Sequence, residues 1–375
     1  MLFRRKVWVA VLIVAILFLM LASQNSQKRH FLPQSLSPPT FRATPANMDT
    51  VVELTAPPAD LTPDPPGKPH TPPPIMNKAK FQRGPADDSQ YDSRSCGCPK
   101  DCISDVTSSD WFSQRYDPRQ QPILRDTNNN FDQDALRWWL GLQRSGNDHT
   151  LEEVMSKMFQ VISPPTVDHR PHPSLCRLCA VVGNSGNLRD SGLGNLIDSH
   201  NSVIRMNKAV TRGFEKDVGN RTTHHFLYPE SAVDVAQGVS LVLLPFKLRD
   251  LEWLTSALST GLIKMTYMRV KERVEADKDK VLVVNPVFFK YVHDKWTEHH
   301  GRYPSTGMLA IIFALHTCDQ VSVFGYGADK QGNWHHYWEE NRYAGAFRKT
   351  GVHSADFETQ IIHHLAKEGK ISLHL

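Results

Sequence analysis

An asparagine-rich turn directly follows an apolar run in the middle of this chain. The run begins at Cys176 and reads C-R-L-C-A-V-V-G-N-S-G-N-L, and a second apolar run, V-I-R-M-N, ends at Asn207. A strand that leads into a small turn offers backbone N–H groups and short amide side chains to a ligand. Such groups hold a phosphate and a ribose without a large charge, so this stretch predicts a nucleotide site.

Three short downstream segments add hydroxyl groups, aromatic rings and histidines. They read R-Y-P-S-T-G at 302–307, H-H-Y-W-E at 335–339 and H-S-A-D-F-E at 353–358. Histidine is the side chain that exchanges protons near neutral pH. The segments therefore predict a site of proton transfer, provided that the fold brings them to the asparagine-rich turn.

Two histidines in these segments have distinctive settings. His336 stands among aromatic residues that include Tyr337 and Trp338. His353 immediately precedes a helix that we expect to begin at Ser354. Because a helix N-terminus disfavours a protonated imidazole, His353 is a candidate for a neutral ring that accepts a proton. The paired histidines at 224–225, 299–300 and 363–364 receive no such role.

The turn Gly183-Asn184-Ser185-Gly186-Asn187 allows three interpretations by itself. The dinucleotide fingerprint G-x-G-x-x-G is not completed, and Asn187 stands where the nucleophile elbow G-x-S-x-G requires its second glycine. A tight turn without any function is the third interpretation. Taken with the downstream segments, nucleotide-sugar binding is the interpretation that we adopt.

These four blocks resemble, in order, the large, small, third and very-small sialylmotifs of animal sialyltransferases, which form glycosyltransferase family 29. The wording is similar to the beta-galactoside alpha-2,3-sialyltransferases of types 1 and 2, which act on Gal-beta-1,3-GalNAc. It includes V-V-G-N-S-G-N-L, T-T-H-H, Y-P-E-S, G-R-Y-P-S-T-G, G-N-W-H-H-Y-W-E and F-R-K-T-G-V-H. The resemblance covers roughly residues 95 to 375.

The resemblance implies inverting transfer of N-acetylneuraminate from CMP-N-acetylneuraminate to the 3-hydroxyl of a terminal galactose. The implied acceptors carry Gal-beta-1,3-GalNAc on O-glycans and on glycolipids (gangliosides), and a homodimer is compatible with the family. CMP leaves as a monophosphate, whose charge protein donors can stabilise, so no metal and no cofactor are expected.

The resemblance also implies the roles of individual residues. His353 is the general base, and His336 donates to the CMP phosphate. The implied donor-binding residues are Asn184, Asn187, Asn207, Tyr267, Tyr303, Ser305, Thr306, Gly307, Gly327 and His336. The implied acceptor-binding residues are Gln143, Tyr267 and Tyr303.

Two other classes of function remain open from the sequence. One is a nucleotide-sugar-binding protein without catalysis, although both candidate histidines are intact. The other is a metal-dependent glycosyltransferase that uses Asp277 and Asp279 as a D-x-D motif. This motif precedes an apolar run and lies among lysines and arginines, so a solvated charged turn is the better interpretation.

Six cysteines, all beyond residue 95, set the redox expectation. C-x-C-x3-C and C-x2-C could bind zinc in a cytosolic protein, whereas disulfides are expected in an oxidising lumen. Sequence alone allows 15 pairings. The resemblance implies the bridges Cys96–Cys102, Cys98–Cys176 and Cys179–Cys318.

Short β-rich runs alternate with helical patterns from Cys179 onward. Such alternation predicts an α/β fold, a single Rossmann-like and mostly parallel sheet with helices on both faces, and the resemblance implies a GT-A-like variant of it. Ligands then bind beyond the carboxyl ends of the strands, near the loops after Gly183 and Gly325. The expected strands are Cys179–Gly183, Val203–Met206, His225–Tyr228, Val239–Leu244, Lys280–Val284, Val321–Phe324 and Ile371–His374.

Capping residues predict where four helices begin. Asp250 is expected to cap a helix that runs through Ser259, and the others open at Asn285, at Ser305 and at Ser354. The segment from Trp111 to Ile162 is expected to form helices that flank the sheet.

The first 92 residues predict a membrane tether. A cytosolic tail (1–6) with Arg4, Arg5 and Lys6 precedes an apolar run, Val7–Ala22, which we interpret as a signal-anchor helix (7–23). A signal peptide cleaved near Ser23 is the alternative. A luminal stem (24–92) follows, with 14 of the 25 prolines, and the catalytic domain spans 93–375.

This topology predicts a single-pass type II protein of the Golgi membrane with a luminal catalytic domain, which stem cleavage could release. Asn220 lies in a glycosylation sequon on the luminal side. The net charge of +4, without a basic stripe interleaved with aromatic residues, argues against a nucleic-acid partner.

Overall fold

The computed structural model describes residues 103, 105–125, 131–143, 149–165, 176–329, 331–340 and 351–375. All of them belong to one unit, Gln82–Leu375. The predicted tail, anchor and stem lie outside the described residues, as do Cys96, Cys98 and Cys102. Among the helices of the described residues, none is long and apolar enough to cross a membrane.

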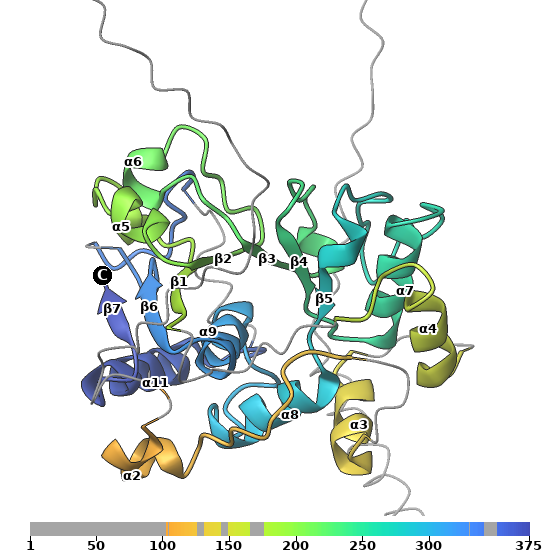
Figure 1. Cartoon of the computed structure of the whole chain (residues 1–375), viewed down its shortest axis with the longest axis horizontal. Helices are drawn as coiled ribbons and strands as arrows, with labels where there is room; N and C mark the ends of the chain where they lie inside the picture. The colour runs from red at the N-terminus through yellow and green to blue at the C-terminus, as the bar shows by residue number, and fades with distance from the viewer. Residues whose placement is uncertain are drawn as a thin grey trace, which may run out of the picture. The chain divides into compact units, whose positions relative to one another are not determined.

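Seven parallel strands form one sheet in the order β5-β4-β3-β2-β1-β6-β7 (Figure 1). All seven predicted strands are confirmed, and their ends differ from the predicted ones by at most one residue. The order reverses between β1 and β6, which is where open α/β sheets bind their ligands. The strands are β1 (Leu178–Val182), β2 (Ser202–Met206), β3 (His224–Leu227), β4 (Ser240–Leu243), β5 (Val281–Val283), β6 (Gln320–Phe324) and β7 (Ser372–His374).

One face of the sheet is covered by α8 (Pro286–Lys295), α9 (Thr306–Thr317) and α11 (Ala355–Lys367). Alternate residues of each strand point to this face, as Cys179 and Val181 of β1 do. Helix α9 is buried on all sides, because every residue from Met308 to Thr317 is buried. It therefore forms the centre of this layer.

Two groups of helices cover the other face (Figure 1). Helices α5 (Gly194–Asp198) and α6 (Glu215–Val218) pack over β1 and β2, against residues such as Ala180 and Val182. Helices α4 (Leu151–Met158) and α7 (Leu248–Ala257) pack over β3 to β5, together with Trp139 of α3 (Gln133–Leu140). The prediction of helices on both faces is confirmed.

Helix α7 differs from the sequence expectation at its start. It begins at Leu248, so Asp250 lies inside its first turn and is not the residue that precedes it. Asp250 is fully buried, accepts a hydrogen bond from the Phe246 N–H and lies 2.6 Å from the Lys247 ammonium. Burial raises its pKa to about 7, against the opposing effect of Lys247. Asp250 is thus a buried ionic partner of Lys247, and the prediction that it caps the helix is wrong.

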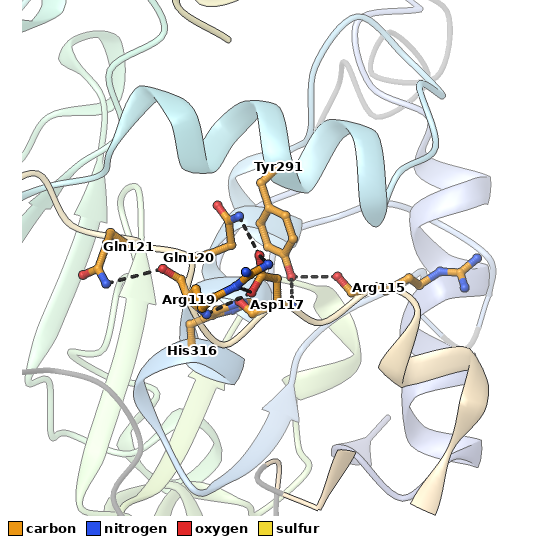
Figure 2. A network of polar contacts seen from close by, with 7 residues as sticks. All are labelled: Arg115, Asp117, Arg119, Gln120, Gln121, Tyr291 and His316. Atoms are coloured by element: carbon orange, nitrogen blue, oxygen red, sulfur yellow. Dashed lines mark hydrogen bonds and ion pairs between the residues drawn. The ribbon is translucent and has the colours of Figure 1, made fainter. Parts of the chain in front are cut away.

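A segment that follows α2 (Asp110–Ser113) is held against α8 and α9 by polar contacts, which Figure 2 shows. The Tyr291 hydroxyl of α8 donates to the Arg115 carbonyl at 2.8 Å and accepts from the Asp117 N–H at 3.1 Å. His316 Nε2 of α9 lies 3.3 Å from the Asp117 carbonyl. The chain then reaches the edge of the sheet, where Leu124 N–H donates to Val283.

A disulfide joins Cys179 of β1 to Cys318 at the end of α9, with 6.1 Å between their Cα atoms. This pairing is the one that the family resemblance implied. Cys176 is also in a disulfide. The implied pairs Cys98–Cys176 and Cys96–Cys102 involve residues outside the described part of the chain.

Candidate active site

A cavity of about 410 Å³ lies at the carboxyl ends of the central strands. The loops that follow β1, β2 and β6 line it, and so do the first turns of α9 and α11. Helix N-termini and turn amides attract anions, so this edge of the sheet suits a phosphate group. The cavity lies where the reversal of strand order predicts a ligand.

Gly183 allows the loops after β1 and β6 to approach each other closely. A Cβ atom at Gly183 would lie 2.3 Å from the carbonyl oxygen of Gly325, which no side chain could accept. The next residue, Asn184, donates its side-chain N–H to the carbonyl of Met206 at 3.1 Å. The asparagine-rich turn is therefore tied to the end of β2 and lies across the floor of the cavity.

Asn207 follows β2 in the left-handed backbone conformation, with φ of 58°. His225 Nε2 lies 2.6 Å from the Asn207 carbonyl, and Asn207 N–H donates to Phe226. These contacts hold the main chain of Asn207 in place. The side-chain oxygens of Asn184 and Asn207 are buried and accept no hydrogen bond from any described residue. Because such atoms are costly to leave without a donor, both are suited to accept from a ligand.

The N-terminus of α9 is fixed by a buried carboxyl group. Ser305 caps the helix by accepting from the Met308 N–H at 3.1 Å. Glu358 of α11 accepts from the Ser305 N–H at 2.8 Å and from the Ser305 hydroxyl at 2.5 Å. Burial raises the pKa of Glu358 to about 7, although both hydrogen bonds oppose this shift. Glu358 thus links the first turns of two helices that line the cavity.

His336 reaches the cavity because residues 335–337 pair with the turn after β1. Gly186 N–H donates to the His335 carbonyl at 2.8 Å, and Tyr337 N–H donates to the Asn184 carbonyl at 3.2 Å. The His336 ring stacks on Trp338 at 4.6 Å between centroids, and its Nδ1 lies 3.0 Å from Glu339 Oε1. With Nδ1 turned toward this carboxylate, Nε2 is the nitrogen that remains for a ligand in the cavity.

His353 also lines the cavity, just before α11. Its Nδ1 lies 2.8 Å from the carbonyl oxygen of Tyr303, an atom that can only accept, so Nδ1 carries the proton and Nε2 is the basic nitrogen. Burial lowers the pKa of the imidazole, while the Tyr303 contact opposes the shift. The ring therefore stays neutral at pH values below the usual titration range of histidine, and Nε2 can then accept a proton.

Tyrosine hydroxyls gather beside the cavity, above a buried group of charges. Tyr228, which follows β3, lines the cavity, and its pKa is raised by burial and by Glu230. Burial, Glu230 and Tyr228, in that order, raise the pKa of Tyr267 to about 12. Both phenols therefore stay protonated and can donate hydrogen bonds. The Tyr303 hydroxyl accepts from Gln143 Nε2 at 3.1 Å.

Residues 123–370 match the family model described as glycosyltransferase family 29 (sialyltransferase). The chain belongs to this sialyltransferase family. It is 56% identical over 281 residues to CMP-N-acetylneuraminate-beta-galactosamide-alpha-2,3-sialyltransferase 2 of Mus musculus, covering 75% of this chain and 80% of that protein. It is 50% identical over 286 residues to the corresponding sialyltransferase 1 of Homo sapiens, covering 75% and 82%. The chain is thus a glycosyltransferase.

Solved structures agree with this assignment. A crystal structure of a mammalian sialyltransferase superposes with a TM-score of 0.69 at 47% identity, over 75% of this chain and 99% of that one. A second, of a mammalian sialyltransferase in complex with Gal-beta-1-3GalNAc-ortho-nitrophenol, has the same TM-score and identity over 74% and 98%. The single parallel sheet is therefore the sialyltransferase fold.

The fold of this sialyltransferase brings most of the expected residues together. Those that line the cavity are Asn184, Asn207, Ser305, Thr306, Gly307, Gly327, His336 and His353. Tyr303 and Gln143 lie behind His353, and Tyr267 is 64% exposed at the side of the tyrosine group. Asn187 instead donates to the Tyr326 carbonyl at 2.7 Å and lines an adjoining cavity of about 400 Å³.

Tyr228 and Glu358 line the cavity and were not among the site residues predicted from the sequence. Tyr228 comes directly after β3, so the rule that selected the loops after Gly183 and Gly325 could have found it. Glu358 is the last residue of the segment H-S-A-D-F-E, and its contact with Ser305 joins positions 53 residues apart. No local signal in the sequence indicates that contact.

Asp277 and Asp279 precede β5 and so lie at the amino ends of the strands, whereas the cavity lies at the carboxyl ends. Asp277 accepts from Gln237 and Asp279 accepts from Ser163, both at exposed positions. The interpretation as a solvated charged turn is confirmed. Asn220 of the sequon is exposed, as a glycosylated residue must be. Its glycosylation stays a prediction.

Proposed function

We propose that this sialyltransferase transfers N-acetylneuraminate from CMP-N-acetylneuraminate to the 3-hydroxyl of galactose in Gal-beta-1,3-GalNAc. The observation that carries the proposal is the contact between His353 Nδ1 and the Tyr303 carbonyl, at 2.8 Å, in a cavity that the first turn of α9 also lines. The names of the relatives support the donor and the alpha-2,3 linkage. The acceptor complex of a similar enzyme supports the disaccharide.

On the donor side, the nucleotide would occupy the turns after β1 and β2. The buried side-chain oxygens of Asn184 and Asn207 would accept hydrogen bonds from the nucleotide. Its phosphate would lie near the first turn of α9, where Thr306 and Gly307 offer backbone N–H groups. Tyr228 would donate to the same group. These donors are fixed before the reaction, so they stabilise the charge that develops on the departing phosphate.

His336 would complete the donor side. A ring that donates from Nδ1 to Glu339 and from Nε2 to a phosphate carries a positive charge. That charge offsets part of the negative charge on departing CMP. With several protein donors in place, a monophosphate leaving group needs no metal, so we expect metal-independent transfer.

On the acceptor side, His353 Nε2 would take the proton from the galactose 3-hydroxyl. The oxygen then bonds to the anomeric carbon of the sialate as the bond from that carbon to the phosphate oxygen breaks, and CMP leaves with the bonding pair. One displacement inverts the anomeric centre, which requires a base on the acceptor and stabilisation of the leaving group. Gln143, Tyr267 and Tyr303 would position the acceptor sugar.

We further propose that residues 7–23 anchor the enzyme in the Golgi membrane as a type II protein, with the stem between anchor and catalytic domain. The apolar run after Arg4, Arg5 and Lys6 supports this orientation. A protease-protection assay on sealed microsomes tests it. An N-terminal tag should be degraded while the C-terminus is spared.

The function is tested by incubating the enzyme with CMP-N-acetylneuraminate and Gal-beta-1,3-GalNAc in excess EDTA. We expect release of CMP with formation of a trisaccharide in which sialate is linked to galactose O3, read by NMR. CMP binding without turnover would indicate a nucleotide-sugar-binding protein. Activity that is lost in EDTA and restored by Mn²⁺ would indicate a metal-dependent enzyme and would overturn the proposed mechanism.

A further inference from the structure

The segment after α7 exposes an unusual concentration of apolar side chains. Seven large apolar residues of the described part of the chain are exposed, and four of them lie between positions 262 and 268. Leu262 is 77% exposed, Met265 55% and Met268 49%. We refer to Leu262, Met265 and Met268 as the apolar tip. Single exposed apolar residues are ordinary, but a cluster of them marks a contact surface.

Backbone hydrogen bonds form a small hairpin that contains Met265 and Met268, and Leu262 lies just before it. Thr266 N–H donates to the Met268 carbonyl at 3.0 Å, and Val270 N–H donates to the Lys264 carbonyl at 3.0 Å. The turn between them points its apolar side chains to solvent. The side chains of Met265 and Met268 are therefore exposed although the hairpin that carries them is held by backbone hydrogen bonds.

A buried ion pair fixes this hairpin to the body of the domain. Thr266 donates its hydroxyl to Glu230, and the Lys247 ammonium lies 3.1 Å from the same Glu230 carboxylate. The side chains of Lys247 and Glu230 are only 3% and 4% exposed. The Lys247 ammonium also lies 4.9 Å from the centroid of the Tyr267 ring. The hairpin thus presents Tyr267 toward the tyrosine group and the apolar tip toward solvent.

Basic residues surround the apolar tip. Residues 262–273 contain Lys264, Arg269, Lys271 and Arg273 against the single acid Glu272. Lys264 pairs with Glu272 at 3.1 Å and Lys271 pairs with Asp234 at 2.8 Å, whereas Arg269 has no carboxylate partner among the described residues. Apolar side chains with a cation beside them match the boundary between the acyl chains and the phosphate-bearing headgroups of a bilayer.

We propose that Leu262, Met265 and Met268 insert into the surface of the bilayer that carries a glycolipid acceptor, with Arg269 at the headgroups. The inference rests on the proposed function, because it concerns how that site reaches a lipid-linked galactose. Tyr267, a proposed acceptor contact, is in the same hairpin, so the apolar tip and the acceptor site share one rigid element. A flexible thioether side chain adapts to irregular apolar surroundings, as a lipid surface provides.

The test compares one enzyme on two forms of the acceptor. Full-length protein is reconstituted in phosphatidylcholine vesicles that contain asialo-ganglioside ending in Gal-beta-1,3-GalNAc, and separately assayed with the soluble disaccharide. The triple variant Leu262→Ser, Met265→Ser, Met268→Ser should lose roughly tenfold or more in rate on the vesicle-bound acceptor, since it removes the apolar burial. Its rate on the soluble disaccharide should equal that of the wild type.

Two further variants sharpen the test. The matched control, Leu196→Ser with Leu375→Ser, removes exposed apolar residues elsewhere and should keep both rates. Phosphatidylserine in the vesicles should raise the wild-type rate on the glycolipid, and Arg269→Glu should abolish this gain. Equal rates of the triple variant and the wild type on the glycolipid would overturn the inference, as would an equal loss on both acceptors.

A mucin-type glycopeptide serves as a third acceptor. If the triple variant loses its rate on the glycopeptide and keeps it on the glycolipid, the apolar tip contacts peptide and the bilayer inference is wrong. If the wild type transfers sialate to none of the three acceptors, the proposed function has failed. The two failures are therefore distinguishable.

Discussion

His353 Nδ1 lies 2.8 Å from the main-chain oxygen of Tyr303. This contact fixes the tautomer of His353, because a carbonyl oxygen cannot donate a proton. It is supported by main-chain pairing of the same two segments, since the Arg302 N–H donates to the Val352 carbonyl at 2.7 Å. Two motifs that are 50 residues apart in the sequence thus together determine that Nε2 is the basic nitrogen of His353.

The first prediction concerns the pH dependence of the rate. Burial lowers the pKa of His353 from its usual value of 6.5. Only the neutral ring can take the proton of the galactose 3-hydroxyl. The rate should therefore fall as the pH decreases through a midpoint below 6.5, measured as kcat/KM against pH. An acid limb with its midpoint above 6.5 would mean that another group limits the reaction.

The second prediction separates the backbone role of Asn207 from its side-chain role. Asn207→Gly keeps the positive φ of 58° and removes the amide, whereas Asn207→Ala adds backbone strain. Both variants should weaken CMP binding by roughly tenfold, the value of one lost hydrogen bond to the ligand. Only Asn207→Ala should also lower the midpoint of thermal unfolding. Unchanged CMP affinity in the glycine variant, measured by calorimetry, would remove the amide from the donor site.

The third prediction uses the buried carboxyl of Glu358. Its pKa is raised from 4.5 to about 7, so between these values the folded state holds a proton that the unfolded chain releases. Wild-type stability should therefore decrease as the pH rises across this interval. Glu358→Gln keeps an oxygen acceptor for the Ser305 N–H and cannot ionise. Its stability relative to the wild type should rise across the interval by up to roughly 3 kcal/mol.

Urea unfolding on either side of this pH interval measures the effect. Asp356→Asn, an exposed carboxyl in the first turn of the same helix, is the matched control and should show no such change. A Glu358→Gln variant whose stability follows the wild type at every pH would show that Glu358 is not a neutral acid in the folded state.

The fourth prediction concerns the Cys179–Cys318 disulfide, which closes a loop of 139 residues. Replacing both cysteines by alanine should lower the free energy of unfolding by up to about 5 kcal/mol, because the loop constrains the unfolded chain. The measurement is the urea midpoint under oxidising conditions. Adding reductant should bring the wild type down toward the variant, and identical midpoints without reductant would contradict the prediction.

The strands and the location of the site could be predicted because their signals are local. The apolar run before Gly183 and the run before Gly325 each end in a glycine, and parallel pairing places both turns at one edge. The N-caps Asn285 and Ser305 likewise accept from N–H groups two or three residues ahead. In each case the interacting partner is close in sequence.

The contacts that orient the site could not be predicted in this way. Asp250 is of a residue type that often caps helices, yet it lies inside α7 beside Lys247, and the Lys247 ammonium also pairs with Glu230, 20 residues away from Asp250. His225 supports the main chain of Asn207 across neighbouring strands. Such pairs depend on the register of the sheet, which the alternation of apolar residues does not specify.

The central claim is that His353 serves the acceptor and His336 serves the phosphate. The most direct measurement combines CMP affinity by calorimetry with initial rates on Gal-beta-1,3-GalNAc for His353→Ala and His336→Ala. His353→Ala should lose on the order of 10²–10⁴-fold in rate with little change in CMP affinity, whereas His336→Ala should lose both. Near-wild-type turnover of His353→Ala, or a loss of CMP binding as severe as that of His336→Ala, would contradict the account.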